Sequence, residues 1–131
     1  MNWRGLGMML TKEKFDNIVK CFYAYYSIDN ITEISKENED KYSNDEIKLL
    51  NITAYGFFKR NVIKKMRSYI SKDYRFVKIY VKSLFIDLNK ISDTKQRLAF
   101  ELRNVILDQL ILLIDGEFET NEKKDIENKE V

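Results

Sequence analysis

Residues 43–70 read SNDEIKLLNITAYGFFKRNVIKKMRSYI, and this stretch decides the fold. It opens with a capping box, because Ser43 precedes the helical pattern and Glu46 stands three residues later. At 100° per residue, apolar side chains fall on one side of the helix and cations on the other. The apolar side holds Tyr55, Phe58, Val62, Met66 and Tyr69, and the opposite side holds Arg60, Lys64 and Arg67. The pattern predicts a long amphipathic helix from Asn44 to about Ile70.

A helix is also predicted on each side of this stretch. Thr11 precedes an apolar series at helical spacing, and Leu10 with Phe15 forms a hydrophobic staple, which predicts a helix over about 12–28. The polar residues 29–42 then form a solvated connection. Ser71 is the expected cap of a third helix, whose core side would be Val77, Tyr80, Leu84, Leu88 and Ile91. Residues 75–82 also alternate as a strand would, but the 3.6-residue pattern continues through Ile91 and favours a helix.

A fourth helix is predicted from Thr94 to Asp115. Asp93, with Gln96 three residues on, is its N-cap, and Gly116 is its expected C-terminal stop. The connections between the last three helices are short, so neighbouring helices should run antiparallel. The chain is therefore predicted to be all-α, an up-down four-helix bundle with short loops. We expect one bundle domain over residues 1–116 and a mobile acidic tail over 117–131.

The composition argues against an enzyme. The chain has no His and a single Cys, so the commonest general base and metal ligand is absent. Cys21 lies at the edge of an apolar helix face with no base nearby, which indicates a packed side chain. Acidic pairs such as Asp45 and Glu46 suit a helix N-terminus better than a metal ion. We predict no catalytic residues, no cofactor, no metal site and no membrane-spanning segment.

Charge is strongly segregated along the chain. Residues 47–86 hold ten Lys or Arg and one acid, whereas the net charge of the whole protein is only +2. Basic residues interleaved with exposed aromatics suit nucleic acid, because phosphates attract the cations and rings can stack on bases. The alternative is that these cations solvate two amphipathic helices and that the aromatics fold back over the bundle. The candidate contact residues for nucleic acid or another partner are Arg60, Lys64, Arg67, Arg75, Lys78, Lys82, Tyr74 and Phe85.

A second feature indicates self-association. On the fourth helix, Leu112 interrupts a polar stripe, with Ile111 at its flank, and both should be exposed in an isolated bundle. An apolar patch on a charged face commonly marks a subunit contact, although single surface leucines are also normal. The acidic tail of one copy could alternatively lie on the basic middle of another.

Two segments carry a resemblance, namely residues 57–67, FFKRNVIKKMR, and residues 100–110, FELRNVILDQL. In these and in its composition the chain resembles small helical proteins of archaeal spindle-shaped viruses. It is particularly similar to a paralogous group of Acidianus two-tailed virus that includes a virion structural protein and an inhibitor of the host RNA polymerase. The resemblance implies a virion component, present in host cytoplasm during assembly, but it transfers no site residue.

Two hypotheses follow. The first is a non-enzymatic virion protein that contacts itself, other virion proteins and nucleic acid. The second is a transcription regulator that binds DNA or the host RNA polymerase through its basic face. The two differ in stoichiometry, since an assembly protein should self-associate.

Overall fold

The computed structural model describes the backbone of residues 8–27 and 42–130, and the side chains of these residues except 27 and 119–130. Helix α2 (Lys12–Ser27) is followed by α4 (Asn44–Phe57), which continues through a π-helical segment, η1 (Phe58–Ile63), into α5 (Lys64–Arg67). We call this continuous element the α4–α5 rod. Helix α6 (Tyr74–Ser83), the short η2 (Leu88–Lys90) and the long α7 (Thr94–Glu130) complete the chain.

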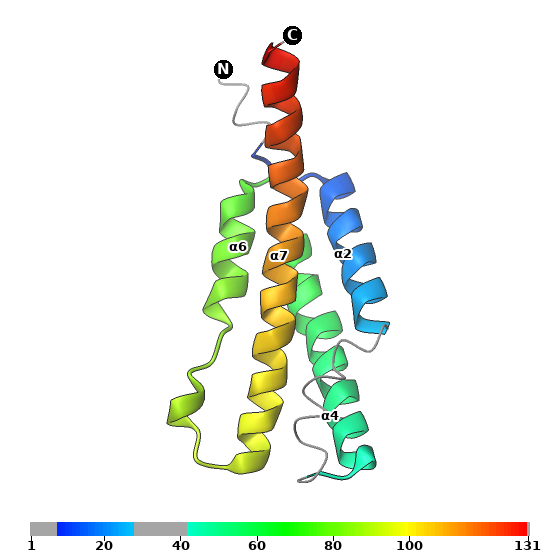
Figure 1. Ribbon diagram of the computed structural model, residues 1–131, viewed down its shortest axis with the longest axis vertical. Helices are drawn as coiled ribbons and strands as arrows, with labels where there is room; N and C mark the ends of the chain where they lie inside the picture. Colours follow the sequence, from blue (N-terminus) through cyan, green and yellow to red (C-terminus); the bar gives the residue numbers. More distant parts are fainter. Residues whose placement is uncertain (1–7, 28–41, 131) are drawn as a thin grey trace.

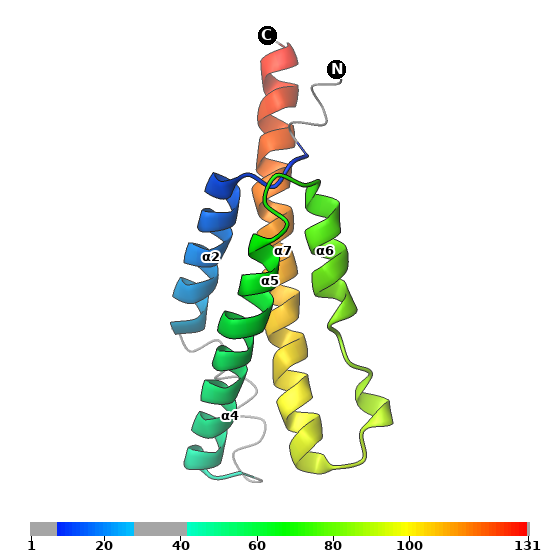
Figure 2. The same cartoon turned by 180° about the vertical axis from the view of Figure 1, so that it is seen from behind.

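Successive elements run in opposite directions (Figure 1), which confirms the predicted all-α, up-down four-helix bundle. Helix α7 packs against α2, α4 and α6. Figures 1 and 2 show α2 and α6 on opposite sides of α7, with the α4–α5 rod between them on its other face. The prediction for residues 29–41 lies outside the described residues. Helix α2 ends at Ser27, close to the predicted boundary.

The core is a single cluster to which all four elements contribute. Phe58, Val62 and Met66 of the rod are fully buried, so the predicted apolar side is correct at these positions. Each such side chain contributes about 1.5–3 kcal/mol through removal of its surface from water. The other buried members include Phe15, Ile18 and Phe22 of α2, Val77 and Val81 of α6, and Leu102, Ile106, Leu107, Leu110 and Ile114 of α7.

Three predicted helix starts are confirmed by hydrogen bonds. The Thr11 hydroxyl accepts from the backbone N–H of Lys14 at 3.1 Å, and both residues of the staple, Leu10 and Phe15, are buried. Ser43 and Glu46 form both bonds of the capping box. The Asp93 carboxylate accepts from the N–H groups of Lys95 and Gln96, at 2.9 and 3.1 Å. These local signals place α2, α4 and α7 without help from tertiary contacts.

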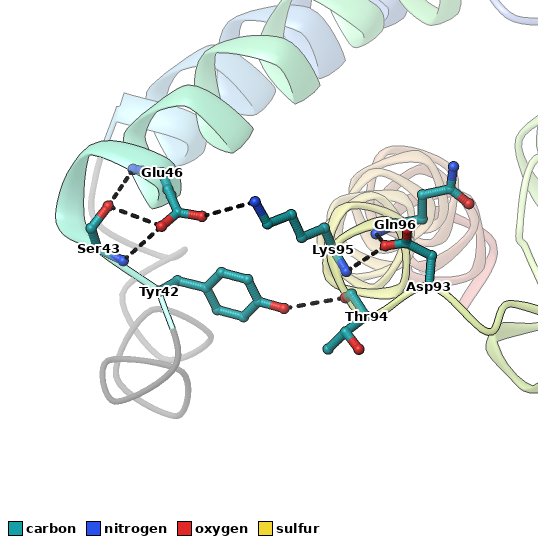
Figure 3. A network of polar contacts seen from close by, with 7 residues as sticks. All are labelled: Tyr42, Ser43, Glu46, Asp93, Thr94, Lys95 and Gln96. Carbon is teal, nitrogen blue, oxygen red and sulfur yellow. Dashed lines mark hydrogen bonds and ion pairs between the residues drawn. The ribbon is translucent and has the colours of Figure 1, made fainter.

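Figure 3 shows that the N-terminal ends of α4 and α7 are also joined to each other. Lys95 of α7 reaches Glu46 of α4, with 3.7 Å between Nζ and the carboxylate oxygen. The Tyr42 hydroxyl donates to the Thr94 carbonyl at 3.3 Å. Because α4 and α7 are parallel, these exposed contacts hold two helix N-termini side by side, and each N-terminus carries a partial positive charge. The carboxylates of Glu46 and Asp93 reduce the repulsion between these two charges.

The predicted cap of the third helix, Ser71, is wrong. Ser71 has a φ of 73°, and its N–H donates to the Leu10 carbonyl at 2.7 Å. The Leu10 N–H donates in turn to the Lys72 carbonyl at 2.8 Å, within an antiparallel bridge between Met9 and Asp73. Pairing with the segment before α2 thus shapes this turn. Asp73 is the real cap, since its side chain accepts from the N–H of Arg75 at 2.9 Å.

The third helix is confirmed as a helix but ends at Ser83, well before the predicted Ile91. The cause is Asn104 on α7, whose side chain holds both backbone groups of Ile86. Its Oδ1 accepts from the Ile86 N–H at 3.1 Å, and its Nδ2 donates to the Ile86 carbonyl at 2.9 Å. These bonds replace the helical partners that Ile86 would otherwise need. Leu88 therefore lies in the short η2 and Ile91 directly after it, in the connection to α7, rather than on a face of α6.

Gly116 does not stop the last helix, because α7 continues through it to Glu130. Its φ is not positive, so it lacks the conformation of a helix C-terminal glycine. Phe118, which the sequence placed in the tail, is only 2% exposed and stacks on Tyr74 with ring centroids 3.8 Å apart. The core therefore extends beyond the predicted domain boundary at 116. The predicted mobility of the tail stays a prediction.

The second predicted helix ends at Arg67 rather than Ile70 and contains the π-helical segment η1. A π turn holds one residue more than an α turn. Two adjacent side chains of η1, Val62 and Ile63, are both buried, so the rod keeps its core contact through this segment. The additional residue changes the helical phase of the residues that follow, relative to a continuous α-helix.

Candidate polyanion-binding groove

The structure separates the predicted basic residues into two sets. Arg60, Lys64 and Arg67 lie on the α4–α5 rod and line one open groove of about 880 Å³. The other set, Arg75, Lys78 and Lys82, lies on α6. We call the first feature the cationic groove and define it by its lining residues: Tyr23, Lys59, Arg60, Ile63, Lys64, Arg67 and Ser68. The two basic faces therefore belong to different parts of the molecule.

The cationic groove lies between α2 and the rod, with η1 contributing much of its wall. Tyr23 comes from α2, whereas every other lining residue comes from the rod or the turn that follows it. Ile63 is 5% exposed and Tyr23 is half-buried, so an aliphatic and an aromatic side chain lie among the cations. The groove is thus apolar where it is deepest and cationic where it meets solvent.

The four cations of the groove have no acidic partner. Within the described part of the chain, no carboxylate forms an ion pair with Lys59, Arg60, Lys64 or Arg67. Two of them lie instead over aromatic rings: the Arg67 guanidinium is 5.6 Å from the Phe15 centroid, and Lys59 Nζ is 6.0 Å from that of Tyr55. These ring contacts orient the side chains without neutralising their charge.

The guanidinium of Arg60 lies near Gly56, one turn earlier on the rod. A Cβ built on Gly56 would be 3.7 Å from Nη2 of Arg60, which is an ordinary contact distance. Sequence analysis singled out Arg60, Lys64 and Arg67 but missed Lys59, Tyr23, Ile63 and Ser68. The signal for Lys59 was its place in the basic block, whereas Tyr23 required knowledge of how α2 packs on the rod.

On α6, by contrast, two of the three cations are paired. Arg75 contacts Asp73 at 2.6 Å, and the Arg75 guanidinium holds the pKa of that carboxyl below its usual range. Lys78 lies 2.8 Å from Asp115 of α7 and is partly covered. Lys82 is exposed. The sequence leaves open whether these residues join Arg60, Lys64 and Arg67 in one surface, and the structure places them on a different element from the groove.

The two aromatics predicted to lie opposite the core are not free for stacking. Tyr74 is half-buried and packs on Phe118, and Phe85 packs against the core as well. The prediction of exposed rings at 74 and 85 is wrong, because α7 continues past Gly116 and brings Phe118 beneath Tyr74. The exposed ring of α6 is Phe76, at 57%.

Of the two residues predicted to be exposed for self-association, only Leu112 is exposed. Leu112 is 63% exposed on the outer face of α7, but Ile111 is half-buried and packs on the core. The structure reveals other exposed apolar side chains that sequence analysis did not single out. They are Leu49 and Ile52 on α4 and Phe76 and Ile79 on α6. Each pair is spaced by three residues and so occupies one side of its helix.

Two tyrosines between α2 and the rod have altered ionisation. Burial raises the pKa of Tyr26 strongly, and its hydroxyl donates to the Asn51 carbonyl at 3.0 Å. Burial also raises the pKa of Tyr23, with nearby Arg67 acting in the opposite direction. Both phenols are therefore neutral at physiological pH. Tyr23 thus presents a hydroxyl, rather than a phenolate, beside the cations of the groove.

Other kinds of site are not evident in the described residues. No cluster of three His, Cys, Asp or Glu that could hold a metal ion occurs among them. The prediction of a packed side chain at Cys21 is wrong, because its thiol is exposed. Across residues 8–27 and 42–130, every helix is too short or too polar to cross a membrane.

Comparisons of the chain with protein-family models, curated proteins and solved structures found no match.

Proposed function

We propose that this protein is a non-enzymatic structural component of a virus particle that binds a nucleic-acid backbone in its cationic groove. The observation that carries the proposal is the set of four cations, Lys59, Arg60, Lys64 and Arg67, that line one groove and form no ion pair with a carboxylate of the described residues. A phosphate backbone is the polyanion that such a row suits best, since each contact releases condensed counterions.

The proposal is supported by the absence of ion pairs between the groove cations and the carboxylates of the described residues. A cation that is already paired must lose its partner before it can bind a phosphate, whereas an unpaired cation has no such cost. The ring contacts of Arg67 and Lys59 also restrict these side chains before binding. Restriction lowers the entropy that binding would otherwise remove. The groove is therefore better suited to a polyanion than the α6 face.

The exposed Leu112 supports the assembly part of the proposal. Together with the exposed pairs on α4 and α6, it gives the bundle apolar positions on several elements, as repeated contacts in a particle require. The alternative function is a transcription regulator that binds DNA or the host RNA polymerase through the same groove. The groove cations favour the assembly function and the regulator function equally, so the two functions are distinguished by whether the protein self-associates.

Nucleic-acid binding is tested by fluorescence anisotropy across a salt series. We compare wild type with Arg60→Ala/Lys64→Ala/Arg67→Ala and with a matched control, Lys48→Ala/Lys82→Ala/Lys90→Ala, which removes the same charge from exposed lysines outside the groove. If all four groove cations contact phosphates of a duplex or of a single strand, the slope of log K against log salt should be roughly −3 to −4. The groove variant should flatten this slope by two to three units, and the control should leave it nearly unchanged.

Equal losses in the two variants would assign binding to overall charge and contradict the groove. If wild type binds neither a duplex nor a single strand at low salt, the nucleic-acid function is refuted. Self-association is measured separately by sedimentation velocity over a concentration range. The assembly function predicts concentration-dependent oligomers that weaken in Leu112→Lys, whereas a regulator should keep one fixed stoichiometry at all concentrations.

A further inference from the structure

The cationic groove places an aromatic ring beside a row of cations. The ring is that of Tyr23 on α2, whereas the cations come from the α4–α5 rod. A duplex carries its phosphates on the outside, so it could contact the cations but would leave the ring unused. A single strand can use both.

The deepest part of the groove is not suited to phosphate. Ile63 is almost fully buried there, and Tyr23 presents a half-buried ring. Phe22 and Tyr55 hold that ring, with centroids 5.7 and 5.9 Å from it. A fixed aromatic side chain beside a row of cations is the combination by which proteins bind unpaired bases. Duplex bases are stacked inside the helix and cannot reach such a ring.

We infer that the cationic groove binds single-stranded nucleic acid, with phosphates along Arg60, Lys64 and Arg67 and a base against Tyr23. This inference rests on the proposed function and specifies its ligand. The hydroxyl of Tyr23 is protonated at physiological pH, as that of an ordinary tyrosine is, so it can donate a hydrogen bond to a base or a phosphate oxygen.

The length of the row also sets the size of the site. Arg60 and Arg67 are seven residues apart on a continuous helical element, which corresponds to roughly 10 Å along its axis. One strand carries a phosphate about every 3.4 Å in a stacked conformation. The groove should therefore cover about three to four nucleotides.

The test compares a fluorescent 12-mer of deoxythymidine with a 12-base-pair duplex at the same salt, using the full chain. Wild type should bind the single strand at least about ten-fold more tightly. Tyr23→Leu should lower single-strand affinity about ten-fold and leave duplex affinity unchanged, since stacking on one aromatic ring has an effect of this order. Tyr23→Phe keeps the ring and should retain most of the preference. Circular dichroism confirms that both variants are folded.

A second measurement needs no substitution. Photo-crosslinking of a 5-iodouracil oligonucleotide to wild type, followed by peptide mapping, should label Tyr23. Equal affinity for both ligands, or crosslinks only at the exposed Phe76, would overturn the single-strand inference while the proposed function stands. If neither ligand binds and an acidic peptide does, both the inference and the proposed function are wrong.

Discussion

The cationic groove and the basic row of α6 contain similar residues but differ in how their charges are used. In the groove, Arg60, Lys64 and Arg67 meet no carboxylate among the described residues. On α6, Arg75 pairs with Asp73 and Lys78 pairs with Asp115. The groove therefore offers its charge to a partner, whereas α6 uses much of its charge within the fold. A basic stretch of sequence does not by itself define a basic recognition surface.

The largest expected effect comes from a substitution in the core beneath the groove. Phe58 is fully buried in η1 and contacts Phe22 of α2, with ring centroids 5.7 Å apart. Phe58→Ala should lower the free energy of unfolding by about 3–5 kcal/mol, because it leaves a cavity between the two groove walls. Urea denaturation measures the loss. Ile52→Ala, at an exposed position of the same rod, should change stability by less than about 0.5 kcal/mol. Similar values for both variants would contradict the packing described here.

The next test removes the hydrogen bonds between α7 and the connection after α6. Asn104 bonds both backbone groups of Ile86 and so attaches the connection after α6 to α7. Asn104→Ala leaves a partly buried N–H and carbonyl without partners, and we expect a loss of about 1–3 kcal/mol. Amide exchange at Ile86 should accelerate by more than at Val77 in the α6 core. Asn104→Asp, which keeps the acceptor but not the donor, should fall between wild type and Asn104→Ala.

A smaller effect is expected at the N-terminus of α6. The pKa of Asp73 is lowered, chiefly by its hydrogen bonds from the Arg75 side chain. A carboxyl with a lower pKa in the folded state stabilises the fold above its unfolded value of about 3.9, and this contribution disappears as pH falls through the folded pKa. Asp73→Ala should therefore cost about 1 kcal/mol at pH 7, the usual size of an N-cap.

The pH dependence supplies the control for Asp73. Urea denaturation at pH 7, 4 and 2 should show wild type and Asp73→Ala approaching each other in stability at the lowest pH. A difference that is the same at all three values would mean that the Asp73 charge does not contribute.

The smallest expected effect is the coupling of Lys78 to Asp115. Both side chains are about a quarter exposed, at 27% and 26%, so solvent screens the pair. A double-mutant cycle with Lys78→Ala and Asp115→Ala should give a coupling free energy of about 0.5–1 kcal/mol. The same cycle with Lys82→Ala in place of Lys78→Ala should give zero. Zero coupling for Lys78 would erase the distinction between the two basic faces.

Sequence reasoning succeeded where the signal was local. The caps at Thr11, Ser43 and Asp93 depend on residues within one helical turn, and each is present in the structure. The buried row of Phe58, Val62 and Met66 followed from helical periodicity in the same way. Local geometry therefore suffices to predict the bundle and one side of the α4–α5 rod.

The errors arose where a distant residue decides the outcome. Ser71 does not cap α6, because its N–H donates a hydrogen bond to the Leu10 carbonyl. The helix ends at Ser83 because the Asn104 side chain forms hydrogen bonds with the backbone N–H and carbonyl of Ile86. Of the candidate site, the cations of the rod were predictable as an exposed row. Two features depend on which helices lie side by side. One is the position of Tyr23 beside these cations, and the other is the ion pair between Lys78 and Asp115.

The single additional residue of the π turn also fixes the register of the α4–α5 rod. The segments α4 and α5 belong to one continuous element, yet their side chains are out of phase by the rotation that this residue introduces. Deletion of one residue within 58–63 would restore an unbroken α-helix and leave the residues beyond it close to their present orientation, because the wide turn already accommodates the additional residue. Insertion of a further residue at 64–66 would instead turn everything beyond it by roughly 100°. Arg67 would then leave the groove while the composition of the rod changed hardly at all. Orientation, rather than charge content, is thus the property of this segment most sensitive to an insertion.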